Sequence, residues 1–343
     1  MSWLSDDDPD DDREFGDWDE SDARVRPNPK GNRPRTKTRP EHEDAIEGRV
    51  LSVDRGRYTV LADEDGPGER VLTCTRAREL RDQAIVTGDR VDVVGDTSGD
   101  EGSLARIVRI RPRTTLLRRS ADDTDEVERV VVANADQLMI VVAAANPEPR
   151  PRLVDRYLVA AYDAGIAPLL VITKTDLADP GPFLANFAAL GIPVITSSQD
   201  AFPIEELTPV LAGHTTVAVG HSGVGKSTLV NALVPGTDRA VGHVNEVTGR
   251  GRHTSSSTVS LRVPTGGWII DTPGVRSFGL GHVDVANVLR SFTDLAAVAE
   301  ECPRGCTHLA DAPDCALDEA VADGRLAAER VDSMRRLLGT LTG

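Results

Sequence analysis

Two nucleotide-binding motifs occur in this chain in the reverse of their usual order. Residues 220–227 read Gly-His-Ser-Gly-Val-Gly-Lys-Ser, a phosphate-binding loop, and they follow residues 173–176, which read Thr-Lys-Thr-Asp. The Thr-Lys-Thr-Asp segment has the form of a guanine-reading motif, which in an ordinary GTP-binding domain comes after the phosphate loop. Because both motifs are present, their rotated order predicts a circularly permuted P-loop α/β domain.

The phosphate loop lies between a predicted strand, 215–219, and a predicted helix that includes 228–233. Its glycines allow backbone N–H groups to point at phosphate oxygens, beside the positive end of the helix. We expect Lys226 to reach the β- and γ-phosphates and the Ser227 hydroxyl to bind Mg²⁺. The residues expected to contact the nucleotide here are Gly220, His221, Ser222, Gly223, Val224, Gly225, Lys226, Ser227 and Thr228.

Two later segments are expected to respond to the γ-phosphate. A predicted strand at 266–270 runs into Asp-Thr-Pro-Gly at 271–274, where Asp271 would hold Mg²⁺ and the Gly274 N–H would sense the phosphate. The polar, Gly-rich residues 249–258 predict a mobile switch that supplies a hydroxyl to Mg²⁺, with Thr254 preferred over Ser255. A plain flexible loop is the alternative interpretation of that segment.

The residue that orients the attacking water is not obvious from the sequence. Many GTPases place a Gln directly after the Asp-x-x-Gly segment, but this chain has Val275, which cannot hydrogen-bond to water. His253 in the first switch is therefore a candidate catalytic residue, together with Lys226 and Thr254. An ordinary switch-loop position for His253 is an equally good interpretation.

Guanine recognition is assigned to the ends of two predicted strands. Apolar runs at 137–143 and 167–173 flank a predicted helix at 153–164, which is a βαβ unit, and ligands bind at the carboxyl edge of such sheets. A carboxylate at Asp176 can accept from N1–H and N2–H₂ of guanine, whereas adenine offers no such pair of donors. The expected base-binding set, which includes backbone N–H groups for guanine O6, is Thr173, Lys174, Thr175, Asp176, Ser197 and Ser198.

Residues 45–113 predict a five-stranded OB-fold barrel that binds RNA, ahead of a GTPase domain at 114–285. Five short alternating runs, 45–53, 57–61, 70–74, 89–94 and 105–110, are separated by Gly- and Asp-rich turns. A barrel without a nucleic-acid ligand is the alternative. A basic edge is expected from Arg109, Arg111, Arg113, Arg118 and Arg119.

Residues 286–343 predict a helical zinc-binding domain. Three thiols and one imidazole, enough for a closed tetrahedral Zn²⁺ site, come from Cys302, Cys306, His308 and Cys315. Amphipathic stretches at 285–299 and 317–338 predict flanking helices that a structural metal would brace. Free thiols in a reducing compartment are the alternative.

The first 44 residues predict a disordered tail. Residues 1–22 carry eleven acidic side chains and one Arg, and residues 24–39 carry seven Lys or Arg and no acid. The basic block is suited either to RNA contact or to solubility. The acidic N-terminus and the lack of an apolar stretch near 18 residues argue against a signal peptide and a membrane span, so a cytoplasmic protein is expected.

Over about residues 45–330 these features resemble the RsgA (YjeQ) family of small ribosomal subunit biogenesis GTPases. The motifs that carry the resemblance are those at 220–227, 251–254 and 271–274 and the Cys/His cluster. It implies a monomer that binds GTP or GDP, Mg²⁺ and one structural Zn²⁺. It also implies late assembly of the 30S subunit as the function, with binding to 16S rRNA and GTP hydrolysis stimulated by the subunit.

Two departures from the family pattern bear on the sites. Thr173 stands where the family usually has Asn, which predicts weaker GTP binding with guanine selectivity kept by Asp176. Three residues separate the first two cysteines and six separate His308 from Cys315, where the family has four and five. Two other functions are compatible with the sequence: a GTP-gated RNA-binding module with little turnover, and a permuted GTPase that acts on the large subunit.

Overall fold

A computed structural model describes residues 42–120, 128–199, 201–235, 258–272, 278 and 280–341, with the side chains of 119, 120 and 128 left out. Residues His42–Gly343 form one compact unit. His253, Thr254, Gly274 and Val275, as well as the charged blocks at 1–22 and 24–39, lie outside the described residues. No helix in the described part of the chain is long and apolar enough to cross a bilayer.

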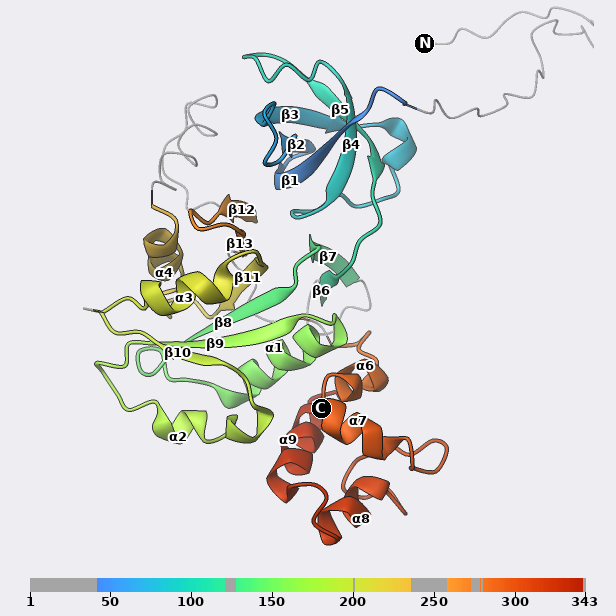
Figure 1. The fold of residues 1–343 in the computed structure, drawn as a ribbon, viewed down its shortest axis with the longest axis vertical. Coiled ribbons are helices and arrows are strands. Elements are labelled where there is room, and N and C mark those ends of the chain that lie inside the picture. Colours follow the sequence, from blue (N-terminus) through green and yellow to red (C-terminus); the bar gives the residue numbers. More distant parts are fainter. Residues whose placement is uncertain are drawn as a thin grey trace, which may run out of the picture. The chain divides into compact units, whose positions relative to one another are not determined.

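The N-terminal part of the unit is a closed five-stranded barrel, which confirms the predicted OB-fold (Figure 1). The hydrogen-bonded order is β1-β2-β3-β5-β4, closed by pairing of β1 with β4, and β3 pairs with β5 in parallel. Alternate side chains such as Val50, Val60 and Leu72 fill its core. The strands are β1 (Ile46–Asp54), β2 (Arg57–Ala62), β3 (Arg70–Arg76), β4 (Arg90–Gly95) and β5 (Ala105–Ile110), with a 3₁₀ turn η2 (Arg78–Leu80).

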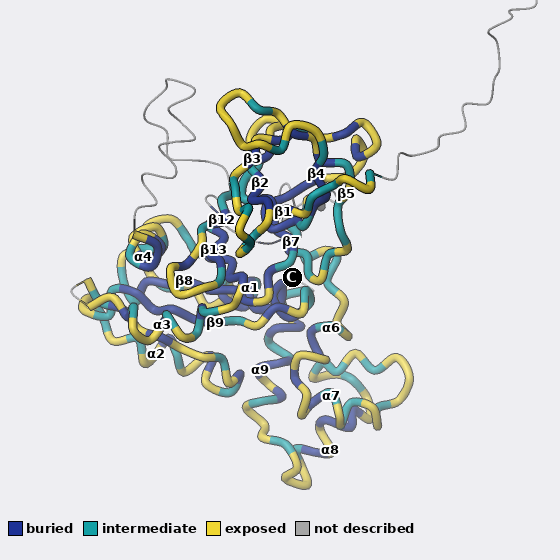
Figure 2. The backbone as a smooth tube through the Cα atoms, turned by 45° about the horizontal axis from the view of Figure 1, so that its top comes forward, coloured by how far each residue is buried: buried dark blue, intermediate teal, exposed yellow. Residues whose placement is uncertain are grey.

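The nucleotide-binding fold is a mostly parallel sheet in the order β10-β9-β8-β11-β13-β12, in which β12 alone runs antiparallel to its neighbour β13. Its strands are β8 (Gln137–Ala143), β9 (Ala167–Thr173), β10 (Val194–Thr196), β11 (Thr215–Gly220), β12 (Val259–Arg262) and β13 (Trp268–Asp271). Every residue of β8 is buried, as expected for a central strand covered on both faces (Figure 2).

Helices cover both faces of this sheet. One core joins β8 and β9 to α1 (Pro151–Asp163), and the other joins β8, β9 and β11 to α3 (Ile204–Leu211) and α4 (Lys226–Leu233). The connection after β9 contains α2 (Gly181–Leu184) and η3 (Ala188–Leu190). A separate hairpin of β6 (Leu116–Ser120) and β7 (Glu128–Ala133) follows the barrel. The residues of β6, Leu-Leu-Arg-Arg-Ser, do not alternate between apolar and polar, so periodicity did not predict this strand.

The C-terminal segment is four short helices, α6 (Val285–Arg290), α7 (Thr293–Ala299), α8 (Ala316–Ala322) and α9 (Ala328–Gly339). The two stretches predicted to be helical, 285–299 and 317–338, are each divided into two helices. The first is interrupted before Phe292, whose ring packs edge-on against Tyr162 of α1 at 5.2 Å. The second is interrupted after α8, where Gly324 has a left-handed φ of 77° that ends a helix readily. These helices share one core with α1 instead of forming their own.

Candidate functional site

The predicted nucleotide-binding segments meet at one edge of the parallel sheet. The base-reading segment follows β9, the phosphate loop follows β11, and Asp271 ends β13, with β8 between β9 and β11. Since carboxyl ends of parallel strands lie at the same edge, the chain order of the motifs does not affect their meeting. The structure thus brings residues 173–176, 220–228 and 271 together.

The phosphate loop has the backbone that its glycines require. Gly223 and Gly225 take left-handed φ values of 83° and 89°, and α4 begins directly afterwards at Lys226. A Cβ at Gly220 would lie 2.5 Å from the carbonyl oxygen of Val141 on β8, so no other residue fits there. Ser222, Gly223, Ser227 and Thr228 are exposed on this surface, whereas Val224 is buried in the core below it.

Lys226 and Asp271 form the closest ion pair of the site. Lys226 Nζ contacts Asp271 Oδ1, and their side chains are only 11% and 25% exposed. The Thr272 hydroxyl, which the sequence did not single out, donates to the Ala218 carbonyl of β11 at 2.9 Å and fixes the end of β13. A phosphate-binding ammonium and a carboxylate suited to Mg²⁺ therefore share one small volume, with the Ser227 hydroxyl on the neighbouring residue. This donor set fits Mg²⁺ bound to nucleotide phosphates.

Thr173 connects the base-reading segment to the phosphate loop. Its hydroxyl lies 2.5 Å from the Val224 carbonyl oxygen and 3.3 Å from the Val142 carbonyl oxygen, and its side chain is buried. A hydroxyl has one proton, so it donates to one of these carbonyls at a time, and the shorter contact is to the phosphate loop. Thr173 therefore bridges the end of β9 to the phosphate loop, and its hydroxyl is already engaged within the protein.

Lys174 and Asp176 flank the same surface. Lys174 has a left-handed φ of 58°, and its ammonium donates to the Gly223 carbonyl at 2.7 Å and to the Asn146 carbonyl. The side chain thus spans from β9 across the phosphate loop. Asp176 is exposed, and its Oδ1 accepts from the Gln199 N–H at 3.0 Å, which leaves Oδ2 with no contact of this kind among the described residues.

Ser197 and Ser198 shape this surface through their backbone. The N–H groups expected to reach guanine O6 donate elsewhere, from Ser197 to Ile172 at 2.8 Å and from Ser198 to Ala201 at 3.2 Å. The Ser197 carbonyl accepts from both the N–H and the hydroxyl of Thr175 at 3.2 Å. In this arrangement the Ser197 carbonyl holds Thr175, and the backbone N–H groups of both serines are already engaged within the protein.

A second site gathers the four C-terminal metal-binding candidates. The ligand atoms of Cys302, Cys306, His308 and Cys315 all lie within 4.8 Å of one another. Cys302 Sγ is 4.0 Å from Cys315 Sγ and 3.6 Å from His308 Nδ1. A tetrahedral Zn²⁺ with ordinary bond lengths spaces its ligands at about 3.8 Å between sulfurs and about 3.6 Å between sulfur and nitrogen. The cluster therefore fits zinc, with all four positions taken by protein ligands, as in structural sites.

Surrounding groups prepare these ligands for a cation. The Ala316 N–H points at Cys302 Sγ from 3.3 Å and the His308 N–H at Cys306 Sγ from 3.4 Å, and both stabilise thiolates. Arg335, on α9, donates to the His308 carbonyl at 3.0 Å and approaches Cys315 Sγ to 3.8 Å. Burial, with Arg335 nearby, lowers the pKa of His308 and so favours the neutral imidazole that a metal binds. No sequence pattern indicated Arg335, which is 20 residues from Cys315.

The Thr173 hydroxyl gives a test of the phosphate-loop bridge. Thr173→Val keeps the shape of the side chain but leaves the Val224 carbonyl without this donor, so we expect GTP and GDP affinity to fall about threefold to tenfold. Thr173→Ser keeps the hydroxyl and should stay close to wild type, whereas Thr173→Asn should tighten GTP. Titration with a fluorescent guanine nucleotide measures all three. Equal affinity of the Val and Ser variants would show that the bridge does not support binding.

The metal site gives a second test. The purified protein should contain about one Zn²⁺ per chain, and His308→Ala should lower that content because three ligands remain. Arg335→Gln, which keeps the ligands but removes their cationic neighbour, should weaken zinc retention during titration with a chelator. Elemental analysis and thiol counting check both variants, and Arg325→Gln at an exposed ion pair is the control. Three freely reactive thiols at 302, 306 and 315 in native protein would contradict the site.

Comparison with known proteins agrees with these two sites. The family described as RsgA GTPase matches residues 110–281. A small ribosomal subunit biogenesis GTPase RsgA of Pseudomonas savastanoi pv. phaseolicola is 41% identical over 302 residues, covering 86% of this chain and 85% of the relative. Its namesake from Pseudomonas aeruginosa strain LESB58 is 40% identical over 311 residues, covering 87% of this chain and 89% of the relative.

Solved structures with the same fold cover a similar share of this chain. YjeQ from Thermotoga maritima is 26% identical with a TM-score of 0.64, covering 87% of this chain and 99% of that protein. YloQ, described as a circularly permuted GTPase, is 26% identical with a TM-score of 0.62, covering 88% and 96%. With the rotated motifs meeting at one sheet edge, and with about 40% identity over 86% to 87% of its length, the chain belongs to the RsgA GTPase family and is a GTP hydrolase.

Proposed function

We propose that this GTPase acts on the maturing 30S ribosomal subunit as a late assembly factor that binds 16S rRNA and is stimulated by the subunit. The observation that carries the proposal is the extent of the similarity. Relatives named small ribosomal subunit biogenesis GTPase RsgA match 86% and 87% of the chain, far more than the nucleotide fold alone. Similarity limited to the nucleotide fold would support the same partner much less strongly.

Hydrolysis is assigned to the residues at the sheet edge. Asp176 selects guanine through its exposed carboxylate, and Lys226 neutralises the β- and γ-phosphates from the start of α4. Ser227 and Asp271 hold Mg²⁺, which supplies positive charge for the phosphates during transfer. Gly274 would sense the γ-phosphate. The roles of His253 in orienting water and of Thr254 at the metal rest on the sequence alone, because both residues lie outside the described part.

The proposed RNA contact is on the barrel, at a place that the sequence did not indicate. Arg109, Arg111 and Arg113, expected to form part of a basic edge, are instead paired with Asp92 or Asp89 at 2.7 to 3.0 Å. These pairs brace β4 and β5, so their charge is locally balanced. An open groove at the end of β3 is lined by three exposed arginines, Arg76, Arg78 and Arg106, beside a single Glu79. A cationic groove of this kind fits a phosphate backbone.

Further properties follow from the same proposal. A single structural Zn²⁺ would brace the four C-terminal helices, whose core otherwise depends on α1. A factor that works on ribosomal subunits is expected in the cytoplasm, and we propose that it acts as a monomer. A GTP-gated RNA-binding module with little turnover, or action on the large subunit, would be distinguished by measuring turnover with each purified subunit.

Base selection tests the nucleotide assignment. Asp176→Asn places an amide where the carboxylate accepts from guanine, so GTP binding should weaken at least about tenfold, as expected for loss of hydrogen bonds to a charged group. Xanthosine nucleotides, which present an acceptor at that position, should bind the variant better than GTP does. Competition against a fluorescent nucleotide gives both affinities. Comparable binding of ATP and GTP by the unchanged protein would show that the base-reading assignment is wrong.

Partner binding tests the ribosomal assignment. Purified 30S subunits should raise kcat at least about tenfold, a modest share of the roughly 10³- to 10⁵-fold known for activation in trans. A variant with Arg76→Gln, Arg78→Gln and Arg106→Gln should bind the subunit more weakly, with the salt dependence of log Kd reduced by about 2 if three phosphate contacts are lost. Arg109→Gln, in an ion pair of the same barrel, is the matched control. Stimulation by 50S subunits and not by 30S subunits would overturn the assignment.

A further inference from the structure

The strand that ends at Asp271 is held from two sides. On one side β13 pairs with β11, the strand of the phosphate loop. On the other side Asp271 pairs with Val259 of β12, and Val259 in turn pairs with Ser52 of β1, in the barrel. The Thr87 hydroxyl of the barrel also donates to the Thr258 carbonyl, next to β12, at 3.2 Å. One strand, β12, therefore separates the barrel from the strand that carries Asp271.

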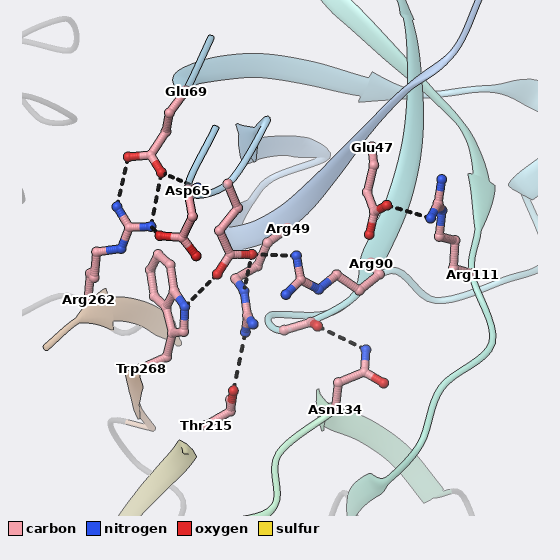
Figure 3. A network of polar contacts seen from close by, with 12 residues as sticks. Glu47, Arg49, Asp65, Glu69, Arg90, Arg111, Asn134, Thr215, Arg262 and Trp268 are labelled. Carbon is pink, nitrogen blue, oxygen red and sulfur yellow. Dashed lines mark hydrogen bonds and ion pairs between the residues drawn. The ribbon is translucent and has the colours of Figure 1, made fainter. Parts of the chain in front are cut away.

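The β1–β12 junction is supported by a network of side chains around Trp268, the first residue of β13 (Figure 3). Trp268 Nε1 donates to Glu64 Oε1 at 2.7 Å, and Glu64 Oε2 pairs with Arg49 Nε at 3.1 Å. The Arg49 guanidinium lies over the indole ring at 4.9 Å, a cation–π geometry. Arg49 Nη1 also donates to the Thr215 hydroxyl of β11 at 3.4 Å.

An outer ring of charge completes this network. The Arg262 guanidinium of β12 also lies over the indole ring, at 5.3 Å. It pairs with Asp65 at 2.6 Å and with Glu69 at 2.8 Å. Arg90 adds a second ion pair to Glu64. Three guanidinium groups from β1, β4 and β12 therefore meet three carboxylates from the β2–β3 connection. The network defined by Arg49, Glu64, Asp65, Glu69, Arg90, Arg262, Trp268 and Thr215 is called the Trp268 network below.

The centre of the Trp268 network is buried, and its contacts are directional hydrogen bonds and ion pairs. Trp268 is 7% exposed and Arg49 is 6% exposed. Burial opposes ionisation of the Glu64 carboxyl. The charges of Arg49 and Arg90 nevertheless hold the pKa of that carboxyl below its usual value. Removing ion pairs from water costs free energy, so such a network contributes less to stability than its contacts suggest. What it provides is a defined geometry, because the indole N–H and the guanidinium groups are each held by specific carboxylates.

We propose that Glu64 and Trp268 are positioning residues for GTP hydrolysis, which fix β13 against the barrel and thereby set the place of Asp271 at the phosphate loop. This inference rests on the proposed role of Asp271 in holding Mg²⁺. Trp268 and Asp271 are three residues apart on one strand, about 10 Å at the usual rise, and Asp271 contacts Lys226 directly. A shift at the indole is therefore transmitted to the ammonium and carboxylate that face the phosphates.

The same connection links the barrel groove to the nucleotide. Glu69, which pairs with Arg262, directly precedes β3, and Arg76 of the groove is the last residue of β3. A displacement of the groove is thus transmitted along β3 to the Trp268 network. The barrel then acts on the reaction through β12 and β13, independently of the basic segment that joins the barrel to the GTPase fold in sequence.

Two near-isosteric substitutions test this role in the full-length protein. Trp268→Phe removes the indole N–H but keeps a ring for Arg49, and Glu64→Gln removes the charge but keeps the shape. For each we expect GTP turnover to fall about tenfold, within the roughly 10²-fold that a misplacement near 1 Å can cost. The Mg²⁺ concentration for half-maximal turnover should rise at least about threefold. The tightening of fluorescent GTP-analogue binding by Mg²⁺ should shrink, while binding without Mg²⁺ changes less than about twofold.

Controls separate positioning from loss of fold. Arg109→Gln breaks a barrel ion pair away from β12 and β13. It should leave GTP turnover, the Mg²⁺ requirement and the Mg²⁺-linked affinity unchanged. The double variant should lose less than the product of the two single losses, because Glu64 and Trp268 are joined by one hydrogen bond and act through the same network. An unchanged Mg²⁺ requirement and Mg²⁺-linked affinity in both single variants would overturn the inference. If Asp271→Asn itself leaves the Mg²⁺ dependence unchanged, the proposed role of Asp271 fails instead. No ribosomal particle is needed, so an error about the partner does not affect the outcome.

Discussion

The nucleotide site depends on the parallel pairing of β9, β8, β11 and β13. Parallel strands present all their carboxyl ends at one edge, so the loops that follow them meet whatever their order along the chain. Circular permutation is compatible with the same site for this reason, and the contacts show it directly: the hydroxyl of Thr173 reaches the loop after β11 from the end of β9. The permutation changes only which segments precede and follow the nucleotide fold.

Those flanking segments are attached by different physical means. The C-terminal helices share an apolar core with α1, in which Leu337 and Phe292 are almost wholly buried. Apolar packing is strong but weakly directional. The barrel is attached through β12 and the Trp268 network, where hydrogen bonds and ion pairs fix the orientation of each partner. The barrel, whose contacts reach the strand of Asp271, is thus the flanking segment that is attached by directional interactions.

Substitution of Thr for Asn at position 173 shows how a motif can change while its structural task is kept. The hydroxyl is short, yet β9 lies close enough to the phosphate loop for it to reach the Val224 carbonyl at 2.5 Å. An Asn side chain would have a second group to offer to the base, whereas Thr has none. On the proposed assignment, guanine selection in this chain therefore falls more heavily on Asp176, whose carboxylate is exposed at the same edge.

The sequence by itself determined the kinds of fold and most of the candidate site. Strands 137–143 and 167–173 have the predicted bounds, because apolar, β-branched runs and glycine-rich turns are local signals. The motifs at 173–176, 220–227 and 302–315 were likewise readable, since each is a short run with its own chemistry. Local periodicity did not show where the C-terminal helices break, because burial of Phe292 against Tyr162 depends on a helix 130 positions earlier.

Only the tertiary structure decided which charges are available and which are already paired. Glu64 and Trp268 are 204 positions apart, and no pattern along the chain connects them. The arginines at 109, 111 and 113 look like a basic edge in sequence, but the barrel folds carboxylates of Asp89 and Asp92 against them. A charge becomes a binding surface or a structural contact according to what lies within a few ångströms of it. That neighbourhood is set by folding, not by sequence order.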